Sequence, residues 1–268
     1  MLNGKVAIVT GAAQGLGRSF CDILLQNGAR VALLDVNEVL GKEVKDDFEK
    51  KYGPDKTQFI KCDVSKDEDF KDGFQKTVEK FSGVDIVCNN AGIVDEKNWE
   101  KTISINLAGV VRGTYLALDC MKKENGGRGG VIVNVASLAG LGPLPPAPIY
   151  TATKHGVMGF SRAMAAVSEL TGAGVRINIL CPSFVSTDLL STFHQEEKTG
   201  QFFCLKDLSA SLLEKYGVLE PAVVAKGLFL LVTDESKNGE VLLISRERAA
   251  FVVFPKGTGE LPCVPVSL

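Results

Sequence analysis

The sequence has few of the residues that mark a metal centre or a disulfide scaffold. Its 268 residues include two histidines, His155 and His194, and no cluster with metal-ligand spacing, so we expect no metal site. Seven cysteines are scattered along the chain without a Cys-x-x-Cys pair. This pattern favours a reduced, cytoplasmic protein over one held together by disulfides.

The sequence also lacks an excess of charge and any long hydrophobic run. Lys and Arg total 30 against 32 Asp and Glu, a formal net charge of −2, which gives no reason to expect a nucleic-acid partner. No apolar run approaches the roughly 18 residues that span a bilayer. The start, "MLNGKVAIVTG", enters a strand pattern too early for a secretory signal. These features predict an ordinary globular protein with no membrane span.

Short apolar runs alternate with longer amphipathic stretches through most of the chain. Runs such as "KVAIVTG", "ARVALLDV" and "DIVCNNAG" are continuously apolar, as in strands that are covered on both faces. The first two strands are each expected to be followed by a helix, and these helices end near Asn27 and Tyr52. Further helices are expected near residues 67–81, 99–123, 149–171 and 221–233. This alternation predicts an α/β fold, a doubly wound parallel sheet of about seven strands with helices on both faces.

We find no internal repeat or linker, and therefore expect a single domain over residues 1–254. The alternation of strand and helix fails at an insertion of about residues 183–216, which contains several phenylalanines. Long insertions in compact domains are usually functional, and the aromatic content argues against disorder, so we expect a lid over a substrate. Residues 255–268, with their prolines and glycines, are expected to form an irregular tail.

The stretch "TGAAQGLG" follows the first predicted strand and opens the first helix. Gly11, Gly15 and Gly17 allow a tight turn, and a helix N-terminus attracts a pyrophosphate. A glycine turn made only for packing would look similar, but its place between strand and helix favours a dinucleotide site. Asp35 ends the next strand, where an acid accepts ribose hydroxyls and repels a 2′-phosphate, and Gln14 adds no cation. The pattern favours NAD over NADP; the alternative for Asp35 is an acid at a helix start.

The stretch "YTATKHG" places a phenol and an ammonium four residues apart, at Tyr150 and Lys154. On a helix this spacing puts both groups on one face. By itself the spacing is also compatible with a packed tyrosine and a lysine whose head reaches water.

Several motifs occur together in a fixed order: "TGAAQGLG", "CDV" at 62–64, "NNAG" at 89–92, Asn106, Ser137 and Tyr150-x-x-x-Lys154. In this combination the chain resembles the short-chain dehydrogenase/reductase family, up to about residue 245. The resemblance implies a Rossmann-type fold and a homodimer. Several faces of the helix near 149–171 are apolar, which fits such an interface.

The resemblance also implies a catalytic set. Tyr150 would be the acid–base, and Lys154, with the positive charge of the nicotinamide, would lower the pKa of its phenol. Ser137 would hydrogen-bond the substrate oxygen, and Asn106 would help to hold a proton path to the lysine. The residues implied to bind NAD are Gly11, Gln14, Gly15, Leu16, Gly17, Asp35, Val36, Cys62, Asp63, Val64, Asn90, Tyr150, Lys154, Val185 and Thr187.

The substrate is expected to be a small hydrophobic alcohol or ketone, such as a hydroxy-fatty acid or a prostaglandin. Ser137, Ala147, Phe184 and Tyr216 are the substrate residues implied; the two aromatic residues have the alternative of being ordinary core. The relatives with the most similar motifs carry a glutamine three residues before the tyrosine, where this chain has Ala147. One hydrogen bond to the reacting hydroxyl would then be absent.

Two other functions remain open at this stage. A carbonyl, ketoacyl or steroid reductase of the same family would use NADPH, which Asp35 opposes. A non-catalytic nucleotide-binding scaffold would have no need of Ser137, Tyr150, Lys154 and Asn106 together. The sequence therefore favours NAD-dependent oxidation of a secondary alcohol.

Overall fold

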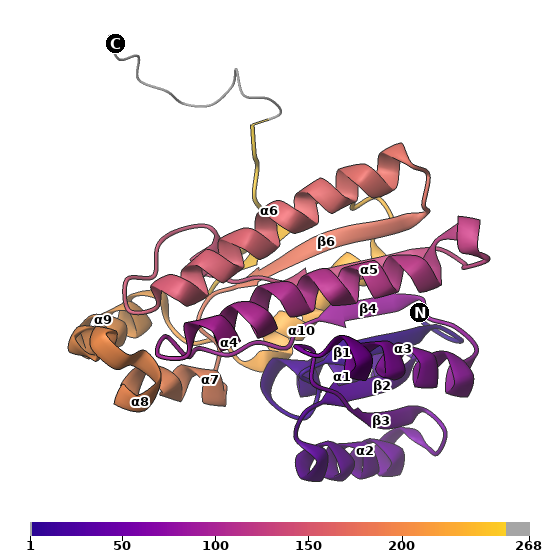
Figure 1. The fold of residues 1–268 in the computed structure, drawn as a ribbon, viewed down its shortest axis with the longest axis horizontal. Coiled ribbons are helices and arrows are strands. Elements are labelled where there is room, and N and C mark those ends of the chain that lie inside the picture. The colour runs from indigo at the N-terminus through magenta and orange to yellow at the C-terminus, as the bar shows by residue number, and fades with distance from the viewer. Residues whose placement is uncertain (1, 256–268) are drawn as a thin grey trace.

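The computed structural model describes residues 2–255, and its centre is an eight-stranded sheet (Figure 1). The strand order is β3-β2-β1-β4-β5-β6-β7-β8, and every neighbouring pair is parallel except β7 and β8. The strands are β1 (Val6–Thr10), β2 (Arg30–Asp35), β3 (Thr57–Lys61), β4 (Ile86–Asn89), β5 (Gly130–Val135), β6 (Val175–Pro182), β7 (Val241–Ile244) and β8 (Ala249–Phe251). The predicted doubly wound α/β fold is confirmed, and β8 is an antiparallel edge strand that the sequence pattern did not predict.

The helices follow the predicted positions closely. They are α1 (Gly15–Gln26), α2 (Glu38–Tyr52), α3 (Asp67–Phe81), α4 (Trp99–Ile103), α5 (Gly109–Met121), α6 (Pro148–Leu170), α7 (Asp188–Ser191), α8 (Glu196–Thr199), α9 (Lys206–Tyr216) and α10 (Pro221–Thr233). The single helix expected near 99–123 is interrupted, because a π-helical turn, Ser104–Ala108, lies between α4 and α5.

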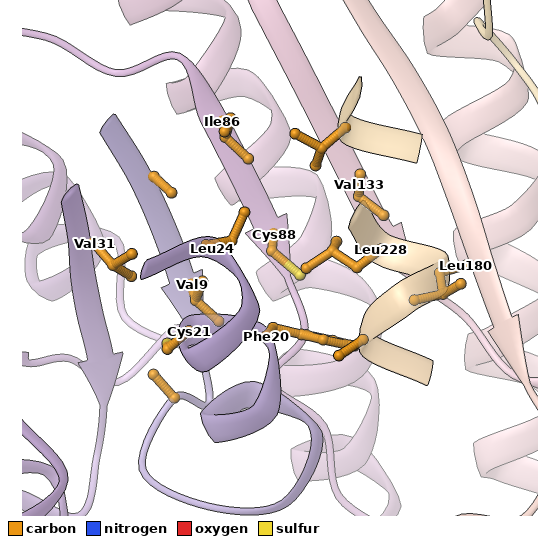
Figure 2. Close-up of a cluster of buried hydrophobic side chains, with 14 of the residues drawn as sticks. Val9, Phe20, Cys21, Leu24, Val31, Ile86, Cys88, Val133, Leu180 and Leu228 are labelled. Atoms are coloured by element: carbon orange, nitrogen blue, oxygen red, sulfur yellow. The ribbon is translucent and has the colours of Figure 1, made fainter. Parts of the chain in front are cut away.

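Alternate residues of each central strand enter two different cores. In β1, Ala7 and Val9 face one core, whereas Val6 and Ile8 face the other. The first core packs under α1 and α10, where Phe20 and Leu228 lie close to the strands (Figure 2). The second packs under α3, α5 and α6. Since both faces are covered, the strands need apolar residues at every position, which explains the continuous runs in the sequence.

The order of the strands reverses between β1 and β4, which are neighbours in the sheet although β2 and β3 separate them in sequence. From β1 the chain winds one way to β2 and β3, and from β4 it winds the other way to β5, β6 and β7. A crevice forms at the carboxyl ends of parallel strands where the winding reverses, and ligands bind there in open α/β sheets.

The predicted insertion, residues 183–216, carries α7, α8 and α9 and lies at one end of the molecule, near the start of α6 (Figure 1). Helices and 3₁₀ turns make up most of it, and one isolated parallel bridge joins Val185 to Leu219. Apart from Pro255, the predicted tail 255–268 lies outside the described residues. Between residues 2 and 255, no helix is long and apolar enough to cross a membrane.

Candidate active site

A cavity of about 960 Å³ opens at the carboxyl ends of the parallel strands. Most of the residues predicted to bind cofactor or substrate line it: Gly11, Gln14, Gly15, Leu16, Asp35, Val36, Cys62, Asp63, Val64, Asn90, Ser137, Tyr150, Lys154, Phe184, Val185, Thr187 and Tyr216. Three predicted residues, Gly17, Asn106 and Ala147, lie outside the lining. The fold therefore brings together side chains and backbone from nearly the whole chain in one place.

The glycine turn between β1 and α1 leaves no room for a side chain at Gly11 or Gly17. Gly11 and Gly15 have positive φ angles of 63° and 53°. A Cβ at Gly11 would lie 2.9 Å from the Cα of Ala91, and one at Gly17 would collide with the carbonyl of Gly11. The N-terminus of α1 receives no side-chain cap. Its free N–H groups and the bare backbone beside them fit a pyrophosphate.

Asp35 is fixed at the rim of this turn by two backbone hydrogen bonds. Its Oδ2 accepts from the amide of Ala13 and its Oδ1 from the amide of Asn37, both at 2.9 Å. An ionised carboxylate has about four lone-pair sites, so it can still accept ribose hydroxyls. The carboxylate faces the cavity next to Val36, which is exposed. This end of the cavity fits an adenosine ribose and opposes a 2′-phosphate.

Asn90 ties the two strands that flank the crevice. Its Nδ2 donates to the carbonyl of Thr10 at 2.9 Å and to that of Gly11 at 3.2 Å. The hydroxyl of Thr10 in turn accepts from the amides of Asn90 and Ala91, both at 3.0 Å. These bonds hold the glycine turn against the end of β4, so Asn90 shapes the cavity wall as well as lining it.

Ser137, Tyr150 and Lys154 come together deeper in the cavity. Tyr150 and Lys154 project from α6, and both are almost fully buried, at 7% and 3% exposure. Ser137, which follows β5, lies beside the hydroxyl of Tyr150 and lines the same cavity. The Nζ of Lys154 donates to the carbonyl of Val135 at 2.8 Å and lies 5.5 Å from the ring centroid of Tyr150. The alternative in which the lysine head reaches water is therefore wrong.

Burial favours the neutral forms of Tyr150 and Lys154 and shifts both pKa values accordingly. It raises the pKa of Tyr150 to about 12, with the neighbouring Ser137 opposing the change, and it lowers the pKa of Lys154 to about 8. Lys154 is not among the groups that shift the pKa of Tyr150 in the protein by itself. The predicted lowering of that pKa by Lys154 and the nicotinamide together stays a prediction. The ammonium of Lys154 donates its hydrogen bond to the carbonyl of Val135.

Asn106 lies behind the cavity, fully buried in the π-helical turn between α4 and α5. Its Oδ1 accepts from the amide of Ile93 and its Nδ2 donates to the carbonyl of the same residue, both at 2.8 Å. A Cβ placed on Gly92 would be 3.4 Å from the Oδ1 of Asn106 and 3.6 Å from the Nζ of Lys154. Asn106 thus lies on the lysine side of the site and is bonded to the loop after β4.

The other end of the cavity is walled by apolar residues of the insertion. Phe184 and Tyr216 pack with their ring centroids 6.4 Å apart. Phe193 is buried at 5% exposure and also lines the cavity. The additional apolar lining that the sequence did not single out includes Leu141, Leu144, Leu189, Leu190 and Leu212. This wall suits a long hydrocarbon substrate.

Ala147 differs from the other predicted substrate residues because it is fully buried. It packs in a cluster with Val94, Tyr150 and Phe193 and has no surface in the cavity. Ser183, which directly follows β6, lines the cavity. Its buried hydroxyl has no hydrogen-bond partner among residues 2–255.

Sequence reasoning missed Glu96, which follows β4 and contacts the first turn of α6. Its carboxylate accepts hydrogen bonds from the amides of Ile149 and Tyr150, 53 and 54 positions further along the chain. Nothing in the stretch "EKNWEKT" distinguishes this acid from those on exposed helix faces, so the sequence offered no signal for it.

The comparisons with known proteins agree with this geometry. The family model described as short chain dehydrogenase matches residues 5–198. The chain belongs to the short-chain dehydrogenase family.

Among curated proteins, the chain is similar to 15-hydroxyprostaglandin dehydrogenase, NAD(+), of Macaca fascicularis and of Homo sapiens. Each is 47% identical over 247 residues, covering 92% of this chain and 93% of the relative. A 3-oxoacyl-acyl-carrier-protein reductase of Thermotoga maritima is 32% identical, covering 90% of this chain and 96% of that protein. Among solved structures, levodione reductase matches with a TM-score of 0.79 and 26% identity, covering 91% of this chain and 97% of that one.

Proposed function

We propose that this chain oxidises a secondary alcohol on a hydrophobic substrate, with NAD as the hydride acceptor. The observation that carries the proposal is the meeting of Ser137, Tyr150 and Lys154 in one cavity, between a glycine turn and an apolar wall. A scaffold protein would gain nothing from burying an ammonium and a phenol together, because burial of a charged group costs free energy.

The residues present fit NAD. The glycine turn and the N-terminus of α1 would hold the pyrophosphate, and Asp35 would accept the ribose hydroxyls. The unpartnered hydroxyl of Ser183 offers a further polar contact within the same cavity. When bound, the nicotinamide supplies a hydride acceptor and a positive charge. That charge would favour the ionised form of Tyr150, against the effect of burial.

The chain's own residues would manage the proton and the position of the alcohol. The hydroxyls of Ser137 and Tyr150, which line the same cavity, would both contact the reacting oxygen. As the carbinol hydrogen leaves as hydride, the phenolate of Tyr150 takes the hydroxyl proton and a ketone remains. Lys154, with a pKa of about 8, is suited to pass that proton onward near neutral pH. Asn106, on the lysine side, would help to hold the exit path.

The substrate proposed is a hydroxy-fatty acid or a prostaglandin-like 15-hydroxy compound. The apolar wall formed by Phe184, Phe193 and Tyr216 supports it, as do the names of the relatives that are 47% identical. The reductase alternative with NADPH is opposed by Asp35. We keep the single domain over residues 1–254 as part of the proposal.

We further propose a homodimer that forms through α5 and α6. Tyr115, on α5, is 51% exposed and stacks edge-on against Phe160 of α6, with centroids 5.9 Å apart. Val167 and Leu170 extend this apolar surface along α6, at 46% and 87% exposure. A cytoplasmic location is supported by the six described cysteines, all of which are free thiols.

The test is turnover by the purified protein. NADH formation would be followed by fluorescence with NAD and a panel of hydroxy-lipids that includes prostaglandin E2, and in parallel with NADP. We expect activity with NAD on at least one apolar secondary alcohol. Activity confined to NADPH and a ketone would instead assign the chain to the reductases.

A further inference from the structure

The helix that carries the acid–base tyrosine begins without a capping side chain of its own. Its N-cap residue is Ala147, and Pro148, the first helical residue, has no N–H. The first backbone donors of α6 are therefore those of Ile149 and Tyr150. Unpaired N–H groups at a buried helix start are costly, and a side-chain oxygen from Ser, Thr, Asp or Asn at the N-cap usually pairs them.

Glu96 supplies both missing acceptors from a different part of the chain. Its Oε2 accepts from the amide of Ile149 and its Oε1 from the amide of Tyr150, each at 2.9 Å. The side chain is only 6% exposed. Burial raises the pKa of the Glu96 carboxyl, whereas these two amide hydrogen bonds oppose the change. The positive end of the helix dipole also favours the ionised form.

The loop that carries Glu96 is itself held on two sides. Asp95 pairs with the ammonium of Lys198 at 3.1 Å, and the carbonyl of Lys198 accepts from the amide of Glu96 at 2.8 Å. On the other side, the hydroxyl of Thr102 donates to the carbonyl of Asp95 at 2.7 Å. With its backbone fixed between α4 and the insertion, Glu96 has little freedom to move away from α6.

We propose that Glu96 is a positioning residue, whose carboxylate fixes the first turn of α6 and thereby aims the hydroxyl of Tyr150 at the reacting oxygen. The inference rests on the proposed function, in which Tyr150 is the acid–base. In this role the carboxylate of Glu96 contacts neither the cofactor nor the substrate. Small displacements of a reacting group reduce rates strongly, so the contribution should appear in kcat rather than in cofactor affinity.

The test compares Glu96→Gln with the parent and with a matched control. In Glu96→Gln one oxygen remains, but an NH₂ group replaces the other and faces a backbone donor. The control is Asp85→Asn, because Asp85 is 3% exposed and its carboxylate accepts from the amide of Val6 at 2.9 Å. Asp85 directly precedes the central strand β4, so it lies at the amino ends of the strands, away from the cavity at their carboxyl ends. Both variants should lose a few degrees of Tm.

We expect Glu96→Gln to lower kcat on the best alcohol by about 10- to 100-fold, with KM for NAD and Kd for NADH within about threefold of the parent. Asp85→Asn should keep the parent kcat. Equal kcat in Glu96→Gln and the parent, or equal losses in both variants, would overturn the inference.

A second readout does not depend on turnover. The chain has four tyrosines, so ring-labelled tyrosine gives four NMR signals, and Tyr150→Phe assigns the one from Tyr150. In Glu96→Gln this signal should shift or broaden while the other three stay in place. An unmoved Tyr150 signal would overturn the inference even if the chain oxidised none of the alcohols tested, and a moved signal would support it in that case.

Discussion

The carboxylate of Asp35 accepts a hydrogen bond from the backbone amide of Ala13 at 2.9 Å. The acid that is proposed to select the cofactor therefore also holds the turn against which the cofactor would lie. Removing Asp35 would change both functions together, so cofactor choice is better tested at its neighbour.

Val36 is 63% exposed beside the cavity and makes a suitable site for that test. The parent should prefer NAD over NADP by at least about tenfold in kcat/KM, because the carboxylate of Asp35 repels a 2′-phosphate. Val36→Arg adds a cation and should narrow the preference while leaving Asp35 and its turn intact. Steady-state kinetics with both cofactors measure this. Equal use of the two by the parent would contradict the assignment of Asp35.

The buried charge of Lys154 is expected to lower the free energy of unfolding of the protein. The pKa of Lys154 is lowered by burial from 10.5 to about 8, so the folded protein binds this proton more weakly than the unfolded chain does. The cost is therefore fully present below about pH 8 and fades as the pH rises toward about 10.5, where the folded lysine is already neutral. The shift corresponds to about 3 kcal/mol at most.

Lys154→Met replaces the lysine by an unbranched side chain of similar length and removes the charge. It should abolish turnover and raise Tm near pH 7 by a few degrees, with a smaller gain near pH 10. Thermal denaturation of both proteins across this range measures the difference. A variant less stable than the parent near pH 7 would show that the hydrogen bond to Val135 outweighs the cost of burying the ammonium.

The proposed dimer predicts a mass twice that of the 28.6 kDa chain. Val167→Glu places a charge in the exposed apolar surface of α6 and should shift the protein toward the monomer in sedimentation experiments at micromolar concentration. The control is Leu230→Glu on α10, a residue that is also exposed, at 41%. A parent that sediments as a single chain would refute the dimer.

Much of the fold follows from local patterns. The continuous apolar runs predict strands covered on both faces, and the helices at 67–81 and 221–233 begin and end where the sequence indicates. The π turn at Asn106 was not predicted, because a helical pattern does not show where an extra residue is inserted. The bonds between Asn106 and Ile93 join segments 13 residues apart, which only the folded chain brings together. The strand β8 is short and lies at the edge of the sheet, so it carries little apolar signal.

The candidate site, like the fold, could be predicted only in part from the sequence. The glycine turn, Asp35 and the Tyr150–Lys154 pair could be predicted because each has a fixed spacing and a chemical reason for it. Glu96 could not be predicted, since its hydrogen-bond partner Tyr150 is more than fifty residues away and its sequence context resembles that of a surface acid. For Ala147 the sequence implied a place at the substrate, whereas packing against Phe193 sets its actual environment.

The most direct test of the central claim follows the hydride itself. The parent protein and Tyr150→Phe would be incubated with NAD and a hydroxy-lipid carrying deuterium on the carbinol carbon, and the reduced cofactor would be analysed by mass spectrometry. We expect the parent to transfer the deuterium to the cofactor and to form the ketone. Tyr150→Phe should be slower by about 100-fold or more, although it folds and binds NADH normally. Reduced cofactor without deuterium, or a variant within about tenfold of the parent, would contradict the proposed chemistry.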